Sequence, residues 1–151
     1  MPVDTLILPN KLNLTSKRDI DDAEAELLFE LYKHVFKQPL KNLTFQNIIR
    51  WHQQWLGSLY DWAGELRSVN LSKNGFQFAA TAQLSRLSKQ FELDFLKSFA
   101  QLPEMPRDQL VRFLAGSHVE LVLIHPFRDG NGRLSRLLLD VMAVEAGGAP
   151  L

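Results

Sequence analysis

Apolar residues along most of the chain recur at intervals of three and four, which is the spacing of one face of an α-helix. The first such run follows Thr15 and Ser16, either of which can cap a helix, and it ends before Pro39. Further runs begin after two more candidate caps, Thr44 and Thr81. The pattern therefore predicts three amphipathic helices in the first two thirds of the chain.

Two more helices are expected in the last third. Pro106 stands where a first helical turn would begin, and the apolar spacing after it continues to Ile124. The next periodic run opens with Gly130 and Gly132, the two glycines that flank Asn131. The residues expected to stop it are Gly147, Gly148 and Pro150.

The segment from Arg67 to Ala79 has a different pattern. Apolar and polar residues alternate on both sides of the tetrad Ser72-Lys73-Asn74-Gly75. An Asn-Gly pair favours a two-residue hairpin turn, because both residues tolerate a positive φ. The sequence thus predicts a mainly α-helical single domain over residues 1–151 with one small β-hairpin.

Composition narrows the classes of function. Lys plus Arg and Asp plus Glu both count 17, so no positive field exists for coating nucleic acid, and direct nucleic-acid binding is not expected. The absence of cysteine excludes thiol chemistry and thiolate metal sites. No apolar run approaches the ~20 residues of a membrane helix, and Met1 to Asn10 lacks the regions of a signal peptide. We therefore expect a cytoplasmic protein that does not bind membranes.

Candidate chemistry is concentrated in one segment between the fourth and fifth helices. It reads His125-Pro126-Phe127-Arg128-Asp129-Gly130-Asn131-Gly132-Arg133-Leu134-Ser135-Arg136. The two glycines around Asn131 allow backbone N–H groups to turn inward and form an anion nest at a helix N-terminus. Arg133 and Arg136 lie three residues apart on one helix face and can bind the outer phosphates of a nucleotide.

Three other side chains of this segment complete the interpretation. Histidine has an unperturbed pKa of about 6.5, so His125 can accept a proton from an incoming hydroxyl near neutral pH. Asp129 can give one oxygen ligand to a Mg²⁺ that takes its other ligands from phosphates and water. Phe127 is expected to anchor the segment in the core. The alternative is a plain Gly-rich turn, but a base, a carboxylate, a nest and two arginines together favour phosphate binding.

The remaining histidines and aromatic residues are interpreted as structural. His34, His52 and His118 lie on expected helices at no metal-ligand spacing. Aromatic residues at helical spacing lie more often in a core than in a binding groove. We therefore interpret four of them as packing residues: Trp51, Trp55, Tyr60 and Trp62.

The segment from His125 to Arg136 resembles the signature of the Fic family, His-Pro-Phe-x-(Asp/Glu)-Gly-Asn-Gly-Arg-x-x-Arg, at every specified position. Asn10-Lys11-Leu12, the run from Tyr60 to Arg67, and Lys73-Asn74-Gly75-Phe76 also resemble a Fic core. The resemblance implies a single Fic-like helical domain with a β-hairpin flap over the site. It implies that His125 deprotonates the target hydroxyl and that Asp129 binds Mg²⁺. The residues that would hold the phosphates of ATP are Gly130, Asn131, Gly132, Arg133 and Arg136.

The resemblance also implies how a target is bound and modified. The flap residues Lys73, Asn74, Gly75 and Phe76 would border the nucleotide and align the target protein by strand-like backbone pairing. Gly132 stands where the related Doc-type toxins, which transfer a phosphoryl group, carry Lys. We therefore expect transfer of AMP from ATP to a Ser, Thr or Tyr hydroxyl of a target protein, with release of pyrophosphate. The alternatives are transfer of a phosphoryl or other nucleotide-linked group, AMP removal on the same fold, and a non-catalytic nucleotide-binding helical module.

Regulation is predicted from one missing motif. Many Fic proteins are inhibited by a helix carrying Ser/Thr-x-x-x-Glu-Gly/Asn, whose Glu pairs with the second motif arginine, here Arg136. The only Ser or Thr with Glu four residues later is Ser88 with Glu92, which lies inside an amphipathic helix and is interpreted as structural. Two explanations stay open. An antitoxin-like partner protein supplies the helix, as in toxin-antitoxin pairs, or the chain is truncated at its C-terminal residues 148–151.

Overall fold

The computed structural model describes residues 7–147 of the chain. Over this range the five α-helices are α1 (Lys17–Lys37), α2 (Phe45–Leu56), α3 (Leu84–Asp94), α4 (Arg107–Ile124) and α5 (Asn131–Glu145). The shorter elements are the 3₁₀ segments η2 (Thr81–Gln83) and η3 (Leu96–Glu104) and the strands β1 (Ser72–Lys73) and β2 (Phe76–Gln77). The predicted mainly helical fold with one small hairpin is confirmed.

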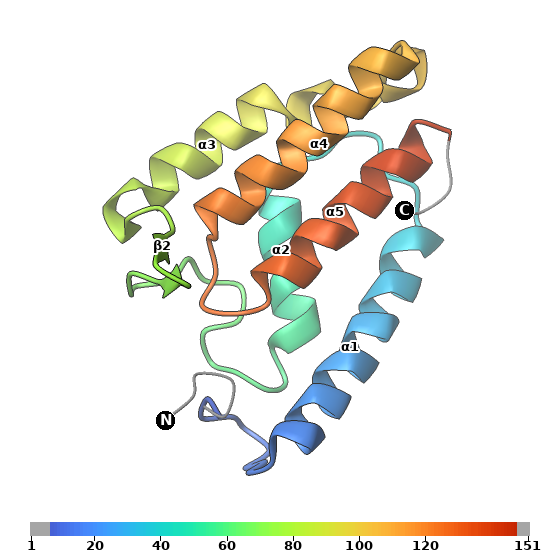
Figure 1. The fold of residues 1–151 in the computed structure, drawn as a ribbon. Coiled ribbons are helices and arrows are strands. Elements are labelled where there is room, and N and C mark those ends of the chain that lie inside the picture. The colour runs from blue at the N-terminus through green and yellow to red at the C-terminus, as the bar shows by residue number, and fades with distance from the viewer. Residues whose placement is uncertain (1–6, 148–151) are drawn as a thin grey trace.

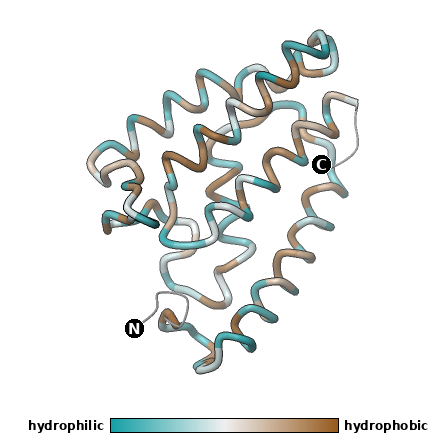
Figure 2. Tube along the Cα trace, in the orientation of Figure 1, coloured by the Kyte–Doolittle hydropathy of each residue, from teal (hydrophilic) through white to brown (hydrophobic). Residues whose placement is uncertain are grey.

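The helices are arranged so that α3, α4 and α5 run side by side, with α2 behind them and α1 along the open side of α5 (Figure 1). The hairpin lies near the point where α4 ends and the α4–α5 loop begins (Figure 1). Hydrophilic and hydrophobic segments alternate along α1, because each turn of a helix with only one face on the core carries both polar and apolar residues (Figure 2). The loop and the hairpin are thus brought to one end of the helical layer.

Two helix starts predicted from capping residues are confirmed. The Ser16 hydroxyl accepts a hydrogen bond from the Asp19 N–H at 3.0 Å and caps α1. At α2, the Thr44 hydroxyl accepts from the Asn47 N–H, and the Asn47 side chain accepts from the Thr44 N–H. Each such cap satisfies N–H groups that have no partner within the helix and stabilises it by about 1 kcal/mol.

Two other predicted helix starts are wrong in detail. Thr81 opens η2 rather than α3, which begins at Leu84 without a side-chain cap. Pro106 is the N-cap of α4 and does not lie in its first turn. Both errors are shifts of one to three residues and leave the apolar faces of the helices unchanged.

The 3₁₀ segment η3, between α3 and α4, is a further difference from the sequence prediction, which does not include it. Its buried residues Leu96, Phe99 and Leu102 are spaced by three. That period fits a 3₁₀ helix, in which residues i and i+3 lie on one line, better than an α-helix. Pro103 near its end also limits α-helical hydrogen bonding.

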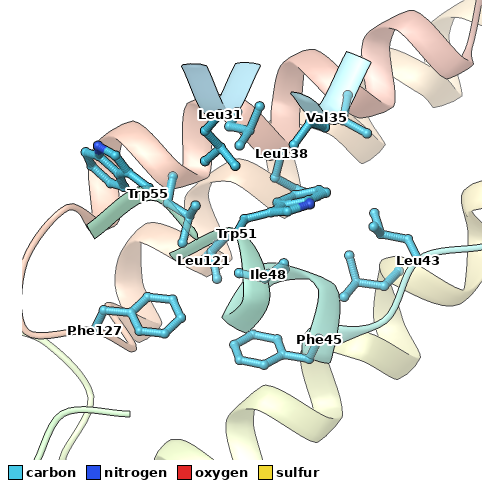
Figure 3. Packing of buried hydrophobic residues seen from close by; sticks show 14 of the residues in the cluster. Leu31, Val35, Leu43, Phe45, Ile48, Trp51, Trp55, Leu121, Phe127 and Leu138 are labelled. Atoms are coloured by element: carbon cyan, nitrogen blue, oxygen red, sulfur yellow. The ribbon is translucent and has the colours of Figure 1, made fainter. Parts of the chain in front are cut away.

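The core lies between α2, α4 and α5 and includes residues of the loop before α5. Ile48 and Trp55 of α2, Leu121 of α4 and Phe127 of the loop are all fully or almost fully buried (Figure 3). The prediction that Phe127 anchors the loop is therefore confirmed.

At the C-terminal end, Gly147 follows α5 with a φ of 95°, as a helix stop requires. The other predicted stops, Gly148 and Pro150, lie outside the described residues, as does the predicted truncation point. Among residues 7–147 no helix is both long enough and apolar enough to cross a bilayer.

Candidate functional site

The side chain of one buried residue, Asn131, closes the α4–α5 loop from within. Asn131 is 3% exposed, and its Oδ1 accepts from the Phe127 N–H at 2.8 Å. Its Nδ2 donates to the Phe127 carbonyl at 2.7 Å. The side chain that the family resemblance assigns to phosphate binding is therefore engaged in closing the loop. Any contact of Asn131 with an anion is left to its backbone N–H.

The two glycines of the loop differ in what they do. Gly130 has a φ of 82°, and a Cβ there would lie 2.6 Å from Cζ3 of the buried Trp55. Gly132 lies in the first turn of α5 outside the left-handed region, and a Cβ there would meet no atom within 4 Å. The expectation that both glycines are required by the backbone holds for Gly130 and is wrong for Gly132. Gly132 instead leaves open space at the N-terminus of α5.

His52 fixes the loop from the side of α2. Its Nδ1 accepts from the Gly64 N–H at 2.8 Å, so Nε2 carries the proton and donates to the Asp129 carbonyl at 3.0 Å. The ring stacks on Phe127 with centroids 3.9 Å apart. Burial lowers the pKa of His52 to about 4, which keeps it neutral. The interpretation of His52 as structural is confirmed, and the segment that it stabilises is the α4–α5 loop of the candidate site.

His125 is the C-cap of α4 and adopts the left-handed conformation, with φ 51°. For a residue with a Cβ this conformation costs about 1–2 kcal/mol, so the surroundings must hold it. Its Nδ1 donates to the Val122 carbonyl at 3.3 Å, because a carbonyl can only accept. In the neutral imidazole, Nε2 is then the nitrogen that carries no proton. The structure thus leaves Nε2 able to accept one.

The surroundings of His125 keep the imidazole neutral. Burial is the main cause that lowers its pKa, and the nearby cations Arg67 and Lys73 lower it further. The hydrogen bond to Val122 and the charge of Asp129 act in the opposite direction. The ring also stacks on Phe78, with centroids 3.7 Å apart. A neutral imidazole in a fixed orientation is the state in which a general base works.

Arg133 is anchored by a carboxylate from α1. Its Nη1 lies 2.8 Å from Oε1 of Glu24, whose side chain is 4% exposed, and its guanidinium lies over the Trp55 ring. The other oxygen of Glu24 accepts from the Tyr60 hydroxyl at 2.6 Å. Burial and the Glu24 contact raise the pKa of Tyr60, which therefore stays a donor. The Arg133 side chain is 41% exposed, so one side of it remains accessible to an anion.

Arg136 lies on the next turn of α5 and is held less closely. Its Nε is 3.5 Å from Oδ1 of Asp140, four residues along the helix, and half of its side chain is exposed. Asp140 is buried and also accepts from the Tyr32 hydroxyl at 2.9 Å. The two motif arginines thus lie on one helix face, as predicted. Arg133 is held by a carboxylate of α1, whereas Arg136 contacts a carboxylate of its own helix, α5.

Asp129 presents a single carboxylate at the start of α5. Its Oδ1 accepts from the Gly130 N–H at 2.9 Å. Within residues 7–147 no group of three or more His, Asp or Glu side chains could surround a metal ion. One carboxylate fits a Mg²⁺ that keeps most of its ligands as phosphate oxygens and water. Asp129 is therefore suited to the role predicted for it.

The hairpin has the turn that its sequence predicts. Asn74 and Gly75 have φ of 50° and 81°, and Lys73 pairs with Phe76. The strands are two residues each, shorter than the alternating pattern suggests, and all four strand residues are exposed. The Phe78 N–H donates to the Leu71 carbonyl at 3.0 Å and extends the pairing on one side.

A match to a protein family accounts for this combination of elements. Residues 42–143 match the model of the Fic/DOC family, a stretch that contains α2, the hairpin and the whole α4–α5 loop. The chain belongs to the Fic/DOC family.

Relatives of this Fic chain are named as adenylyltransferases. The chain is 27% identical to a probable protein adenylyltransferase Fic of Escherichia coli (strain K12), over 93% of the chain and 70% of that protein. It is 32% identical to a protein adenylyltransferase Fic of Nematostella vectensis, over 96% of the chain and 34% of that protein. The chain thus spans only about a third of the length of the second relative.

Solved Fic structures show the same fold. The N-terminal Fic domain of a Bartonella effector protein from Bartonella sp. AR 15-3 superposes with a TM-score of 0.84 at 21% identity, covering 97% of this chain and 72% of that one. BepC from Bartonella tribocorum, with bound AMPPNP, gives a TM-score of 0.79 at 19% identity, covering 97% and 77%.

The pair that most resembles an inhibitory Fic motif is structural, as predicted. Glu92 accepts the Phe45 N–H at 2.6 Å and so ties α3 to the start of α2. Ser88 is buried on the same helix.

Three residues of the site were not assigned a role from the sequence. Glu24 is a carboxylate on the apolar face of α1, at helical spacing from the buried Ile20 and Leu31, and that position is a signal for a buried ion pair. Arg67 and Phe78 flank the hairpin, and only the tertiary fold brings them to His125.

Proposed function

We propose that this chain transfers the AMP group of ATP to a hydroxyl group of a target protein. The observation that carries the proposal is the state of His125, a neutral imidazole with Nδ1 hydrogen-bonded and Nε2 unprotonated, at the start of the loop that leads to the N-terminus of α5. The relatives named protein adenylyltransferase and the Fic structure with bound AMPPNP support the same reaction class.

The reaction is an in-line displacement at the α-phosphorus. The target hydroxyl oxygen forms a bond to this phosphorus, and the bond from the phosphorus to the oxygen bridging to the β-phosphate breaks. The proton of the hydroxyl passes to Nε2 of His125, and pyrophosphate leaves. His125 is already oriented through Nδ1, so no reorganisation is needed when the proton moves.

The phosphates would lie against the N-terminus of α5. The N–H groups of Asn131 and Gly132 are free of intrahelical partners at a helix start, and the helix dipole favours an anion there. Arg133 and Arg136 each have an exposed part that can meet a phosphate oxygen. Asp129 would hold a Mg²⁺, which when bound would neutralise charge on the phosphates.

The exposed flap residues Lys73 to Phe76 suit a target segment that adds to the hairpin edge. Only two residue pairs form the hairpin, and its strands have no other strand as neighbour within the described residues. Pairing through the backbone depends little on the target's side chains. The flap would therefore align a Ser, Thr or Tyr hydroxyl with Nε2 of His125.

Labelling of a protein lysate with ATP tests the proposal. The chain is incubated with Mg²⁺ and either α-labelled or γ-labelled ATP, and modified proteins are identified by mass spectrometry. AMP transfer predicts label from the α-position only, and its loss in the His125→Ala variant. His34→Ala, which changes an exposed histidine on α1, is the matched control and should label as the wild type does. Label from the γ-position would indicate phosphoryl transfer, and equal labelling by His125→Ala would remove the base from the mechanism.

Control of the site by a partner protein is part of this proposal. Because Arg136 is half exposed and contacts Asp140 only at 3.5 Å, a glutamate from an added Ser-x-x-x-Glu-Gly helix could pair with it more closely. A charge-assisted contact of about 1.5–3 kcal/mol corresponds to roughly a 10- to 100-fold fall in labelling. Replacing that glutamate by glycine should restore labelling, and inhibition that persists would assign it to another contact.

A further inference from the structure

Arg67 is a buried cation between α2 and the hairpin. The residue is 5% exposed, and burial lowers the pKa of its guanidinium. Within residues 7–147 it forms no salt bridge, and its hydrogen-bond partners are backbone carbonyls. A buried charge is tolerated only when its donors are satisfied, so these carbonyls decide where the guanidinium lies.

The carbonyls come from two different parts of the site. Nε donates to the His125 carbonyl at 2.6 Å, and Nη2 donates to the Ile124 carbonyl at 3.2 Å. Nη1 donates to the Val69 carbonyl at 2.8 Å, and Nη2 also donates to the Ala79 carbonyl. The carbonyls of His125 and Ile124 lie at the end of α4. Those of Val69 and Ala79 lie before β1 and after β2, on the two sides of the hairpin. One planar guanidinium therefore joins the base to the flap.

Backbone hydrogen bonds follow the same route. The Arg67 N–H donates to the Pro126 carbonyl at 2.9 Å, and the Ala79 N–H donates to the Leu123 carbonyl at 3.3 Å. Phe78, which precedes Ala79, is the residue whose ring stacks on His125. The flap arm that carries Phe78 is thus fixed to the same helix end as the imidazole.

The contacts also bear on the unusual backbone of His125. The carbonyls of Ile124 and His125 lie at the C-terminal end of α4, where neither has an intrahelical partner. Arg67 donates to both, and a cation at a helix C-terminus is also favoured by the dipole. The conformation that aims the imidazole is therefore supported by the guanidinium.

We propose that Arg67 is a positioning residue that holds the His125 imidazole against Phe78 and so fixes the base and the flap as one unit. The inference rests on His125 being the base of the proposed reaction. The geometry it concerns, however, can be measured without any turnover.

The charges facing His125 give the direction of one further effect. Arg67 and Lys73 lower the pKa of His125, and Asp129 raises it. Arg67→Gln removes a positive charge and admits water to the ring, and both changes raise this pKa. Arg67→Lys keeps the charge but has no planar fork of donors, so the stacking is lost and the pKa rises less than in Arg67→Gln, through the loss of burial alone.

NMR of the whole protein tests the proposal. Because the His125 ring stacks on Phe78, the ring current should shift the Hε1 resonance of His125 upfield in the wild type. This resonance is assigned among those of the four histidines by its absence in His125→Ala. Phe78→Leu gives the position of this resonance without stacking. Arg67→Gln and Arg67→Lys should both move it to the Phe78→Leu position, and the pKa of His125 should rise more in Arg67→Gln, which also loses the charge, than in Arg67→Lys. Arg112→Gln, an exposed arginine on α4, is the matched control and should change neither.

The same variants are then assayed for AMP transfer. A displaced base predicts a fall in kcat on the order of 100-fold with little change in KM for ATP. A wild-type upfield shift retained in folded Arg67→Gln overturns the inference, and if that variant does not fold, the same result in Arg67→Lys overturns it. If the wild type transfers no AMP, the proposed function fails, while the resonance positions still decide whether Arg67 holds His125.

Discussion

The α4–α5 loop and the flap meet at His125 but are built in opposite ways. The loop is stabilised by buried side chains on every side, including Asn131 inside it, His52 from α2, and the fully buried Phe127. The flap consists of two residue pairs, all exposed, and is tied to the protein mainly through Arg67 and Phe78.

The difference indicates which part of the reaction each region specifies. In the proposed reaction, the rigid, buried groups would position the atoms of a nucleotide that is the same in every turnover. The exposed hairpin edge would accept different target segments, because backbone pairing sets the alignment and side chains add little. Changes in the loop should therefore lower both stability and the rate of transfer, whereas changes of the exposed flap residues should alter target labelling with little change in stability.

The largest effect is expected from Gly130→Ala. The added Cβ would force a left-handed alanine and lie 2.6 Å from the buried Trp55 ring. Left-handed strain and overpacking together predict a loss of about 3 kcal/mol of folding free energy. Gly132→Ala is the matched control, since its Cβ meets open space and helix propensity favours alanine by about 0.5–1 kcal/mol. Urea denaturation followed by tryptophan fluorescence measures both, and equal stabilities would contradict the assigned role of Gly130.

A similar loss is expected on mild acidification. The unfolded His52 takes up a proton near the ordinary pKa of about 6.5, whereas the folded residue does so only near pH 4. Stability from this group is therefore present in full above pH 6.5 and is lost as the pH falls toward 4, by roughly 3 kcal/mol. His52→Gln should flatten this part of the stability–pH curve. If the curve keeps its slope in the variant, another group causes the acid loss.

A smaller effect is expected from Glu24→Gln, which keeps the shape of the side chain but removes its charge. The buried carboxylate holds Arg133, but the arginine is partly exposed and solvent screens the pair. We expect a loss of about 1 kcal/mol in stability and weaker ATP binding, measured by denaturation and calorimetry. Glu26→Gln, an exposed carboxylate on the same helix, should change neither. Unchanged ATP affinity in Glu24→Gln would show that Arg133 needs no anchor.

The smallest effect on stability is expected from Lys73→Ala in the flap. Lys73 is exposed, so its replacement should change the folding free energy by less than about 0.5 kcal/mol. Labelling of a target should fall no more than about fivefold, as expected for an exposed charge near a nucleotide. A destabilisation as large as that of Gly130→Ala would mean that the flap is part of the folded core.

The sequence predicts the loop well because its chemistry is contiguous. His125, Asp129 and Arg136 lie within one short segment, and the spacing of the arginines fixes their common helix face. Asn74-Gly75 predicts the hairpin for the same local reason.

The partners of these residues come from distant parts of the chain and are less accessible from the sequence. The Glu24–Arg133 pair depends on how α1 lies against α5, and the Arg67 contacts depend on how the segment after α2 lies against the end of α4, which no local pattern specifies. Local spacing also does not reveal η3, because a period of three and a period of 3.6 differ little over so few residues.

The most direct test of the account is the pH dependence of AMP transfer between pH 5 and 8, at saturating ATP and with one identified target. Because burial and the nearby cations lower the pKa of His125, the imidazole is already neutral above its ordinary value. We expect a rate that is constant from pH 8 down to about 6.5 and falls below that pH, with the fall moved to higher pH in Arg67→Gln. A rate that rises steadily through pH 7 to 8 would show that the proton is taken by a group other than the neutral His125.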